Sequence, residues 1–257
     1  MNYPLPISIL RDRKLILIAA TITVVLGFAF SAFGAMLVNS FDELEPVSGP
    51  EAISFILERG GFAGPVCAVA SAYIICTALR SGTFATVLLL RGRRASVFIS
   101  YFLSTQILAL TLGVLSLVPN WLVLLRFTSV EIDPKSLALG SLLSLILCSV
   151  WATFAFGLAL VTGSLSISVS LLLLWPFVIE GLLVSSAATL GSTVPRLLEL
   201  MPAGVTSSLL EAFRPKYLVL LQPSESTWSD PIRLLALLFW LLIALFAARA
   251  SFGRRSL

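Results

Sequence analysis

Long apolar stretches alternate with short polar segments along the whole chain, and this pattern predicts the fold. A helix needs ~20 apolar residues to cross a bilayer, because only intrahelical bonding satisfies its backbone there. Six stretches qualify: about Leu15–Val38, Phe62–Leu79, Val97–Val118, Leu137–Val161, Ser166–Ala187 and Pro231–Ala248. The sequence therefore predicts an all-α polytopic membrane protein, a single transmembrane domain over residues 1–257 with six transmembrane helices.

Three connecting segments complete this prediction. Pro119–Ser136 is expected to be a compact loop. The uncharged Thr162-Gly163-Ser164 is expected to be a turn, since without it the fourth and fifth stretches would form one span of about fifty residues, far longer than a bilayer requires. The segment from Ala188 to Asp230 is too apolar for a solvated loop and too broken for a span. Re-entrant or interfacial helices before the last span fit it best.

The composition excludes a water-soluble domain. The chain is 58% hydrophobic and only 12% charged, whereas soluble domains are about a quarter charged. The three cysteines, Cys67, Cys76 and Cys148, lie inside apolar stretches and are interpreted as small buried hydrophobic residues. The first apolar stretch is longer than the ~7–15 residues of a signal-peptide core, so we interpret it as a retained span.

Basic residues orient the predicted helices. Ten of the seventeen fall into three clusters, within 11–14, 80–94 and 249–255. Lys and Arg that flank short loops stay on the cytoplasmic side. The pattern therefore predicts a plasma (inner) membrane protein with both termini in the cytoplasm and an even number of crossings. The net charge of +4 follows from this bias, and without a basic groove interleaved with aromatic residues we expect no nucleic-acid partner.

Residues that could carry chemistry are few. The chain has no histidine, no aspartate inside a predicted span and no G-x-x-x-x-G-K-[ST] phosphate loop. We therefore expect no catalytic, cofactor-binding or metal-binding residues, and any ATP would be hydrolysed by another chain. Glu180 is the one ionisable residue well inside a predicted span, where a charge costs ~2.5–3.5 kcal/mol. Either it faces a polar pathway, or the helix ends at Pro176 and Glu180 lies in the outer interface.

The segment from Arg80 to Arg94 is the most specific in the chain. A polar Arg-Ser-Gly-Thr entry is followed by a short amphipathic stretch and a basic exit. It resembles the region between the second and third spans of ABC-2 type exporter permeases, where E-x-R-x-G-T precedes a short helix that docks on the ATPase subunit. Arg80, Gly82 and Thr83 match this pattern, whereas Ala78 stands where the family often has Glu. Ordinary cytoplasmic anchoring is the alternative reading of Arg91–Arg94.

Two further stretches support the resemblance, which covers the layout of nearly the whole chain. Glu199–Gly204 is similar to an L-P-x-x-A/G segment after the fifth span, and Leu235–Arg255 is similar to the last helix. The resemblance implies a permease subunit of an ATP-driven exporter that forms half of a substrate pathway. Its partners would be the lipid bilayer, an ABC ATPase subunit that binds ATP and Mg, and a second permease chain, identical or paralogous. The cargo would be amphipathic: a drug, a peptide antibiotic or a lipid-linked molecule.

The same resemblance assigns roles to individual residues. Residues 82–89 would form the coupling helix, and Phe84, Val87 and Leu88 would be its apolar anchor on the ATPase, at i, i+3 and i+4. Gly82 permits either a close backbone contact or an unusual turn, and the Thr83 hydroxyl can cap the first turn. Because the fifth and second helices line the pathway in this family, Glu180 would belong to it. The alternative function, an ATP-independent transporter or channel, would require several polar groups at mid-membrane and paired broken helices.

Overall fold

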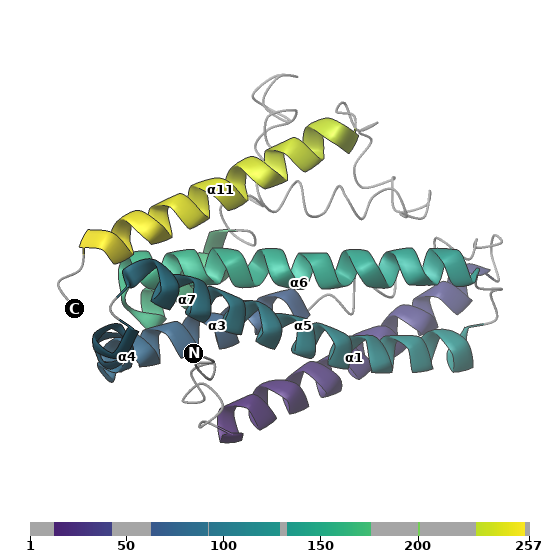
Figure 1. The fold of residues 1–257 in the computed structure, drawn as a ribbon. Coiled ribbons are helices and arrows are strands. Elements are labelled where there is room, and N and C mark those ends of the chain that lie inside the picture. The colour runs from purple at the N-terminus through teal and green to yellow at the C-terminus, as the bar shows by residue number, and fades with distance from the viewer. Residues whose placement is uncertain are drawn as a thin grey trace.

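The computed structural model of the chain describes residues 13–42, 63–91, 93–128, 133–175, 200 and 230–254. The described residues form helices joined by turns and contain no strand, which confirms the all-α prediction for them (Figure 1). The helices are α1 (Arg13–Asp42), α3 (Ala63–Arg80), α4 (Thr83–Arg91), α5 (Arg94–Phe127), α6 (Pro134–Thr162), α7 (Leu165–Leu174) and α11 (Asp230–Arg254).

Five of these helices are long and apolar enough to cross a membrane, namely α1, α3, α5, α6 and α11. They coincide with five of the six predicted stretches, so the chain has the helices of a multi-pass membrane protein. The fifth predicted stretch begins as α7, which is ten residues long in the described part. The rest of that stretch, including Glu180, lies outside the described residues, as does most of the segment predicted to hold re-entrant or interfacial helices.

Two polar contacts fix the relative direction of α1 and α5. The Ser31 hydroxyl donates to Asn120 Oδ1, and farther along both helices Asn39 Nδ2 donates to the carbonyl oxygen of Phe127 over 2.7 Å. The contacts advance in the same sense along the two sequences. The helices α1 and α5 are therefore parallel, as the first and third crossings of a membrane must be.

The helix α6 runs antiparallel to α5. Trp121 Nε1 of α5 donates to Ser141 Oγ near the start of α6, over 3.0 Å. Gln106 lies earlier in α5, yet its Nε2 donates to Thr153 Oγ1 farther along α6, over 2.9 Å. These contacts advance in opposite senses, as expected for consecutive crossings.

The helix α11 runs parallel to α6. Buried Val150 and Leu237 share one apolar cluster, and two turns farther along both helices Gly157 meets Ala244. A Cβ built on Gly157 would lie 3.4 Å from the Ala244 Cβ. Both helices consequently end at the same end of the bundle. The chain leaves α6 there and enters α11 from the opposite end.

Small residues of α3 let it approach α6 closely. Four of them, spaced four residues apart, are buried: Gly64, Ala68, Ala72 and Cys76. A Cβ built on Gly64 would lie 2.6 Å from Trp151 Cδ1 of α6, so a larger side chain would force the helices apart. Small residues at such crossings are typical of helix contacts in membranes, where close packing has to replace the hydrophobic driving force.

The predicted turn between the fourth and fifth stretches is confirmed. The helix α6 ends at Thr162 and α7 begins at Leu165. Gly163 has a φ of +65°, the left-handed conformation in which helices commonly end on glycine. Its N–H donates to the Ala159 carbonyl over 2.9 Å. The turn between α6 and α7 therefore depends on Gly163, which has no Cβ.

The predicted loop that starts at Pro119 is wrong in its first half, because α5 continues through Pro119 to Phe127. A proline inside a helix removes one backbone hydrogen bond. The local sequence therefore favours termination of the helix near Pro119. Contacts with α1 offset this loss. Asn120 accepts a hydrogen bond from Ser31, and Val123 and Leu124 are buried in a cluster with Ala35.

Candidate functional site

The turn between α3 and α4 is built on Gly82. Its φ is +69°, and its carbonyl accepts the first hydrogen bond of α4 from the Thr86 N–H, over 3.0 Å. A Cβ built on Gly82 would meet nothing within 4 Å. The φ of Gly82 therefore fits the unusual turn predicted for this position. A close backbone contact with a partner subunit stays a prediction.

Polar residues surround this turn. Arg80, the last residue of α3, is exposed. The Thr83 hydroxyl, predicted to cap the first turn of α4, lies 2.6 Å from Ser81 Oγ and shares a hydrogen bond with it. A helix of nine residues, α4, thus stands where the sequence predicts a short helix between two spans.

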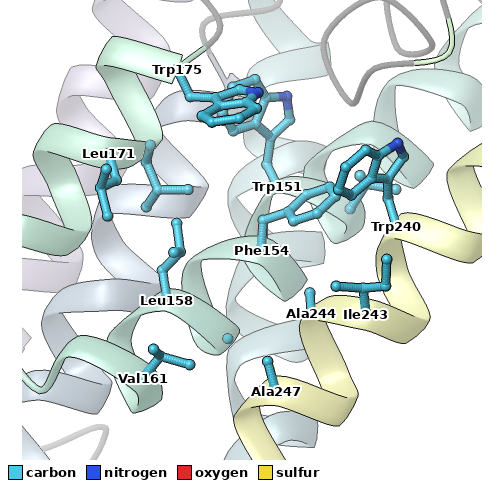
Figure 2. Close-up of a pocket in the computed structure, with 13 residues that line it drawn as sticks. Trp151, Phe154, Leu158, Val161, Leu171, Trp175, Trp240, Ile243, Ala244 and Ala247 are labelled. Atoms are coloured by element: carbon cyan, nitrogen blue, oxygen red, sulfur yellow. The ribbon is translucent and has the colours of Figure 1, made fainter.

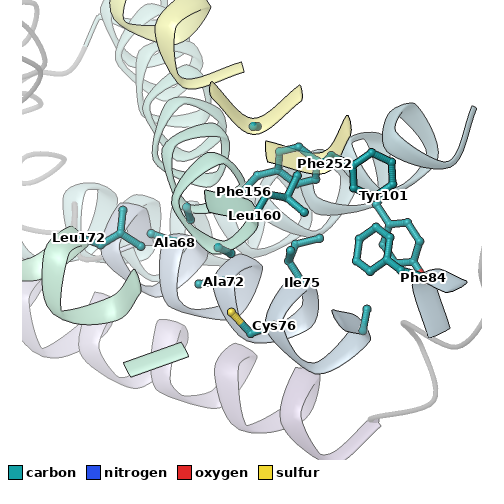
Figure 3. Close-up of a cluster of buried hydrophobic side chains, with 14 of the residues drawn as sticks. Ala68, Ala72, Ile75, Cys76, Phe84, Tyr101, Phe156, Leu160, Leu172 and Phe252 are labelled. Atoms are coloured by element: carbon teal, nitrogen blue, oxygen red, sulfur yellow. The ribbon is translucent and has the colours of Figure 1, made fainter. Parts of the chain in front are cut away.

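The inner face of α4 is buried within the chain. Phe84 is only 1% exposed. Its ring stacks on Tyr101 of α5 with centroids 4.0 Å apart and is tilted against Phe252 of α11 at 5.5 Å (Figure 3). Val87 and Leu88 pack against the same cluster. Phe84 therefore anchors α4 to its own bundle. Val87 and Leu88 are only partly buried, and docking of this helix on an ATPase stays a prediction.

The outer face of α4 presents different residues. Leu89 is 86% exposed, and Thr86 is exposed beside it. A hydrophobic side chain so fully exposed at the end of a short helix is suited to contact with another molecule. A partner docking on α4 would thus meet Thr86 and Leu89, which the sequence analysis did not single out.

The bundle end around α4 is positively charged. Arg80, Arg93 and Arg94 are exposed there, and Arg94 Nη1 donates to the Gly253 carbonyl of α11 over 2.8 Å. The same end carries Arg254 in the last turn of α11. Within the described ranges no carboxylate lies in this group. The end of α3, the start of α5 and the end of α11, which bear predicted cytoplasmic basic clusters, thus meet in space, although α11 lies far from the other two in sequence.

A second candidate is an apolar pocket between α6, α7 and α11, with a volume of about 400 Å³ (Figure 2). Its described lining has no charged side chain, and its residues are Val150, Trp151, Phe154, Gly157, Leu158, Val161, Leu171, Leu172, Trp175, Trp240, Ile243, Ala244 and Ala247. No local pattern in the sequence indicates this pocket, because three helices supply its lining at helical spacing, as in an ordinary core.

Other predicted features are placed only in part. Leu200, from the stretch that is similar to the L-P-x-x-A/G segment, lies against α11, where its carbonyl accepts a hydrogen bond from Trp240 Nε1 over 2.9 Å. The described residues hold no group of three or more His, Cys, Asp or Glu side chains that could bind a metal ion. Cys67, Cys76 and Cys148 are buried, as predicted.

The fold and these sites define a multi-pass helical membrane protein. No protein-family model matches the sequence, and the comparison with curated proteins finds no match. The more specific function therefore has to be argued from the residues themselves.

Proposed function

We propose that this chain is the permease subunit of an ATP-driven exporter of the ABC-2 type. The observation that carries the proposal is α4. This short helix sits between two spanning helices at the basic end of the bundle, with its inner face packed on α5 and α11 and Leu89 exposed on its outer face. It also follows the Arg80, Gly82 and Thr83 pattern that resembles the coupling region of such permeases.

The packing of α4 gives a route for mechanical coupling. An ATPase that binds Thr86 and Leu89 would push on a helix whose opposite face packs against Tyr101 and Phe252. Close-packed interiors transmit such displacements. Movement of α4 would therefore move the ends of α5 and α11 and change access to the pathway, and the turn at Gly82 would serve as the pivot.

The helix directions support six crossings. The helix α6 ends at the basic end, whereas α11 begins at the opposite end and returns. The chain between them must cross back an odd number of times. The turn at Gly163 and α7 begin this return, and the predicted stretch Ser166–Ala187 is long enough to finish it. With the basic end cytoplasmic, both termini lie in the cytoplasm of a cell whose plasma (inner) membrane holds the protein.

The remaining parts of the proposal follow the resemblance. This chain supplies half of a pathway, a second permease chain supplies the other half, and the ATPase subunit binds ATP and Mg. Glu180 would line the pathway, and the cargo would be amphipathic. The experiment that tests the proposal is recovery of an ATPase with the tagged chain from its native membrane, followed by transport assays of the two proteins together.

The proposed orientation gives a labelling prediction. In a version with Cys67, Cys76 and Cys148 replaced by alanine, a cysteine at Asp42 should react with an impermeant thiol reagent added to intact cells. A cysteine at Gly92 should react only after the membrane is permeabilised, because the basic end faces the cytoplasm. The measurement is the labelled fraction before and after permeabilisation. Labelling of the cysteine at Gly92, and not of the cysteine at Asp42, in intact cells would show that the proposed orientation is wrong.

A further inference from the structure

The apolar pocket contains no residue of α4, and its dimensions suit an elongated ligand. Along α6 its lining runs from Val150 to Val161, which corresponds to roughly 16 Å at the helical rise of 1.5 Å per residue. Three indoles, of Trp151, Trp175 and Trp240, surround one end, and Ala247 lies toward the other (Figure 2).

The lining selects for an apolar ligand. Its described side chains are aliphatic or aromatic, and the indole N–H of Trp240 already donates to the Leu200 carbonyl over 2.9 Å. A polar group placed in the pocket would lose its hydration without gaining hydrogen-bond partners, which is unfavourable. Ordered water is disfavoured for the same reason, because it needs two to four polar partners. An alkyl chain carries no polar group and avoids this desolvation cost.

The position of the pocket indicates where an alkyl chain that enters it would come from. It lies between α6, α7 and α11, of which α6 and α11 are long enough to span a membrane. Ligands at that depth come from the surrounding lipid. A volume of about 400 Å³ is near the lower end of ligand pockets, ≈ 300–1,000 Å³, and therefore suits one hydrocarbon chain better than a bulky molecule.

The positively charged side chain of Arg254 lies beyond the Ala247 end of the pocket. Arg254 follows Ala247 by seven residues, which is two helical turns, so both lie on the same face of α11 about 10 Å apart. Arg254 is exposed, and Arg94 reaches the neighbouring Gly253 carbonyl. Two guanidinium groups thus stand where the headgroup of a lipid in the pocket would emerge, and guanidinium pairs well with phosphate.

From these observations we infer that the pocket binds one acyl chain of an anionic phospholipid, with the lipid phosphate directed toward Arg254. This site lies within a single chain and does not depend on an ATPase partner. It is also separate from α4, so the exporter proposal and the lipid site can fail independently of each other.

The experiment uses the purified full chain in detergent micelles, and the probe is phosphatidylglycerol whose acyl chains carry bromine, a short-range quencher of tryptophan emission. Quenching should saturate at about one lipid per chain and should be reversed by unbrominated phosphatidylglycerol. Ala247→Phe fills the pocket and should weaken binding at least about tenfold. Ala138→Phe is the matched control, because Ala138 is exposed on α6 outside the lining and should leave the affinity unchanged.

Two further comparisons test whether the lipid headgroup matters and whether the bound acyl chain belongs to a phospholipid or to a free fatty acid. Brominated phosphatidylcholine should bind more weakly than phosphatidylglycerol, and Arg254→Gln should remove that difference. Equal binding of the two lipids by the unaltered chain would overturn the role of Arg254. Brominated fatty acid that binds as tightly as phospholipid would overturn the phospholipid assignment.

The site itself would be overturned by quenching that rises without saturation, or by Ala247→Phe binding the lipid as tightly as Ala138→Phe does. Gel filtration of both variants shows whether they fold. If Ala247→Phe does not fold, Leu158→Phe fills the same pocket from α6 and decides the question together with the competition by unbrominated lipid.

Discussion

Replacing Phe84 by alanine is expected to lower the free energy of unfolding by about 3 kcal/mol, at the low end of the loss for a buried phenylalanine. Phe84 is 1% exposed and stacks on Tyr101, so the change leaves a cavity and weakens the packing of α4 on the bundle. Phe84→Asp should cost more, since it also buries a carboxylate without a partner. Denaturant titration in mixed micelles measures both losses.

The matched control lies on the opposite face of the same helix. Leu89 is 86% exposed, and Leu89→Ala should change the free energy of unfolding by no more than about 0.5 kcal/mol, as exposed substitutions usually do. If Phe84→Ala is as stable as Leu89→Ala, then α4 is not anchored through its aromatic face, and the proposed coupling route through Tyr101 and Phe252 is lost.

The second large effect concerns the partner. Leu89→Asp should reduce the affinity for the ATPase at least about tenfold, which corresponds to 1.4 kcal/mol, because a carboxylate would replace an apolar side chain in the contact. The unfolding free energy should stay at the wild-type value. The measurement is the amount of ATPase that co-purifies with the tagged chain over a range of ATPase concentrations.

A control for added charge comes from the start of α5. Ala95 is exposed at the same basic end but lies outside α4. Ala95→Asp should therefore retain the ATPase. Loss of the ATPase in both variants would indicate a general effect of negative charge at this end of the bundle. Retention of the ATPase in both variants would show that α4 is not the docking helix.

The spanning helices could be predicted from the sequence because lipid leaves the backbone no alternative to a helix. The predicted stretches fall within α1, α5, α6 and α11 and match α3 to within one residue. The turn at Gly163 was also predictable, since a span of twice the bilayer thickness is not viable. These predictions needed only hydropathy and the length of each apolar stretch.

The errors and omissions share a cause, which is contact between segments far apart in sequence. The continuation of α5 past Pro119 depends on Ser31, 89 residues before its partner Asn120. The amphipathic pattern of residues 84–88 shows that one face of α4 is covered, but not that Phe252 covers it. The lipid-binding pocket likewise joins α6, α7 and α11, and no local pattern reveals a cavity.

The central claim is that this chain moves cargo only when an ATPase drives it, and reconstitution in liposomes tests it most directly. ATP hydrolysis and the uptake of a fluorescent amphipathic drug are measured for the chain alone, the co-purified ATPase alone and both together. We expect uptake only when both proteins are present, dependent on ATP and lost with Leu89→Asp. Uptake by the purified chain without ATP or an ATPase would contradict it and would favour an ATP-independent transporter or channel.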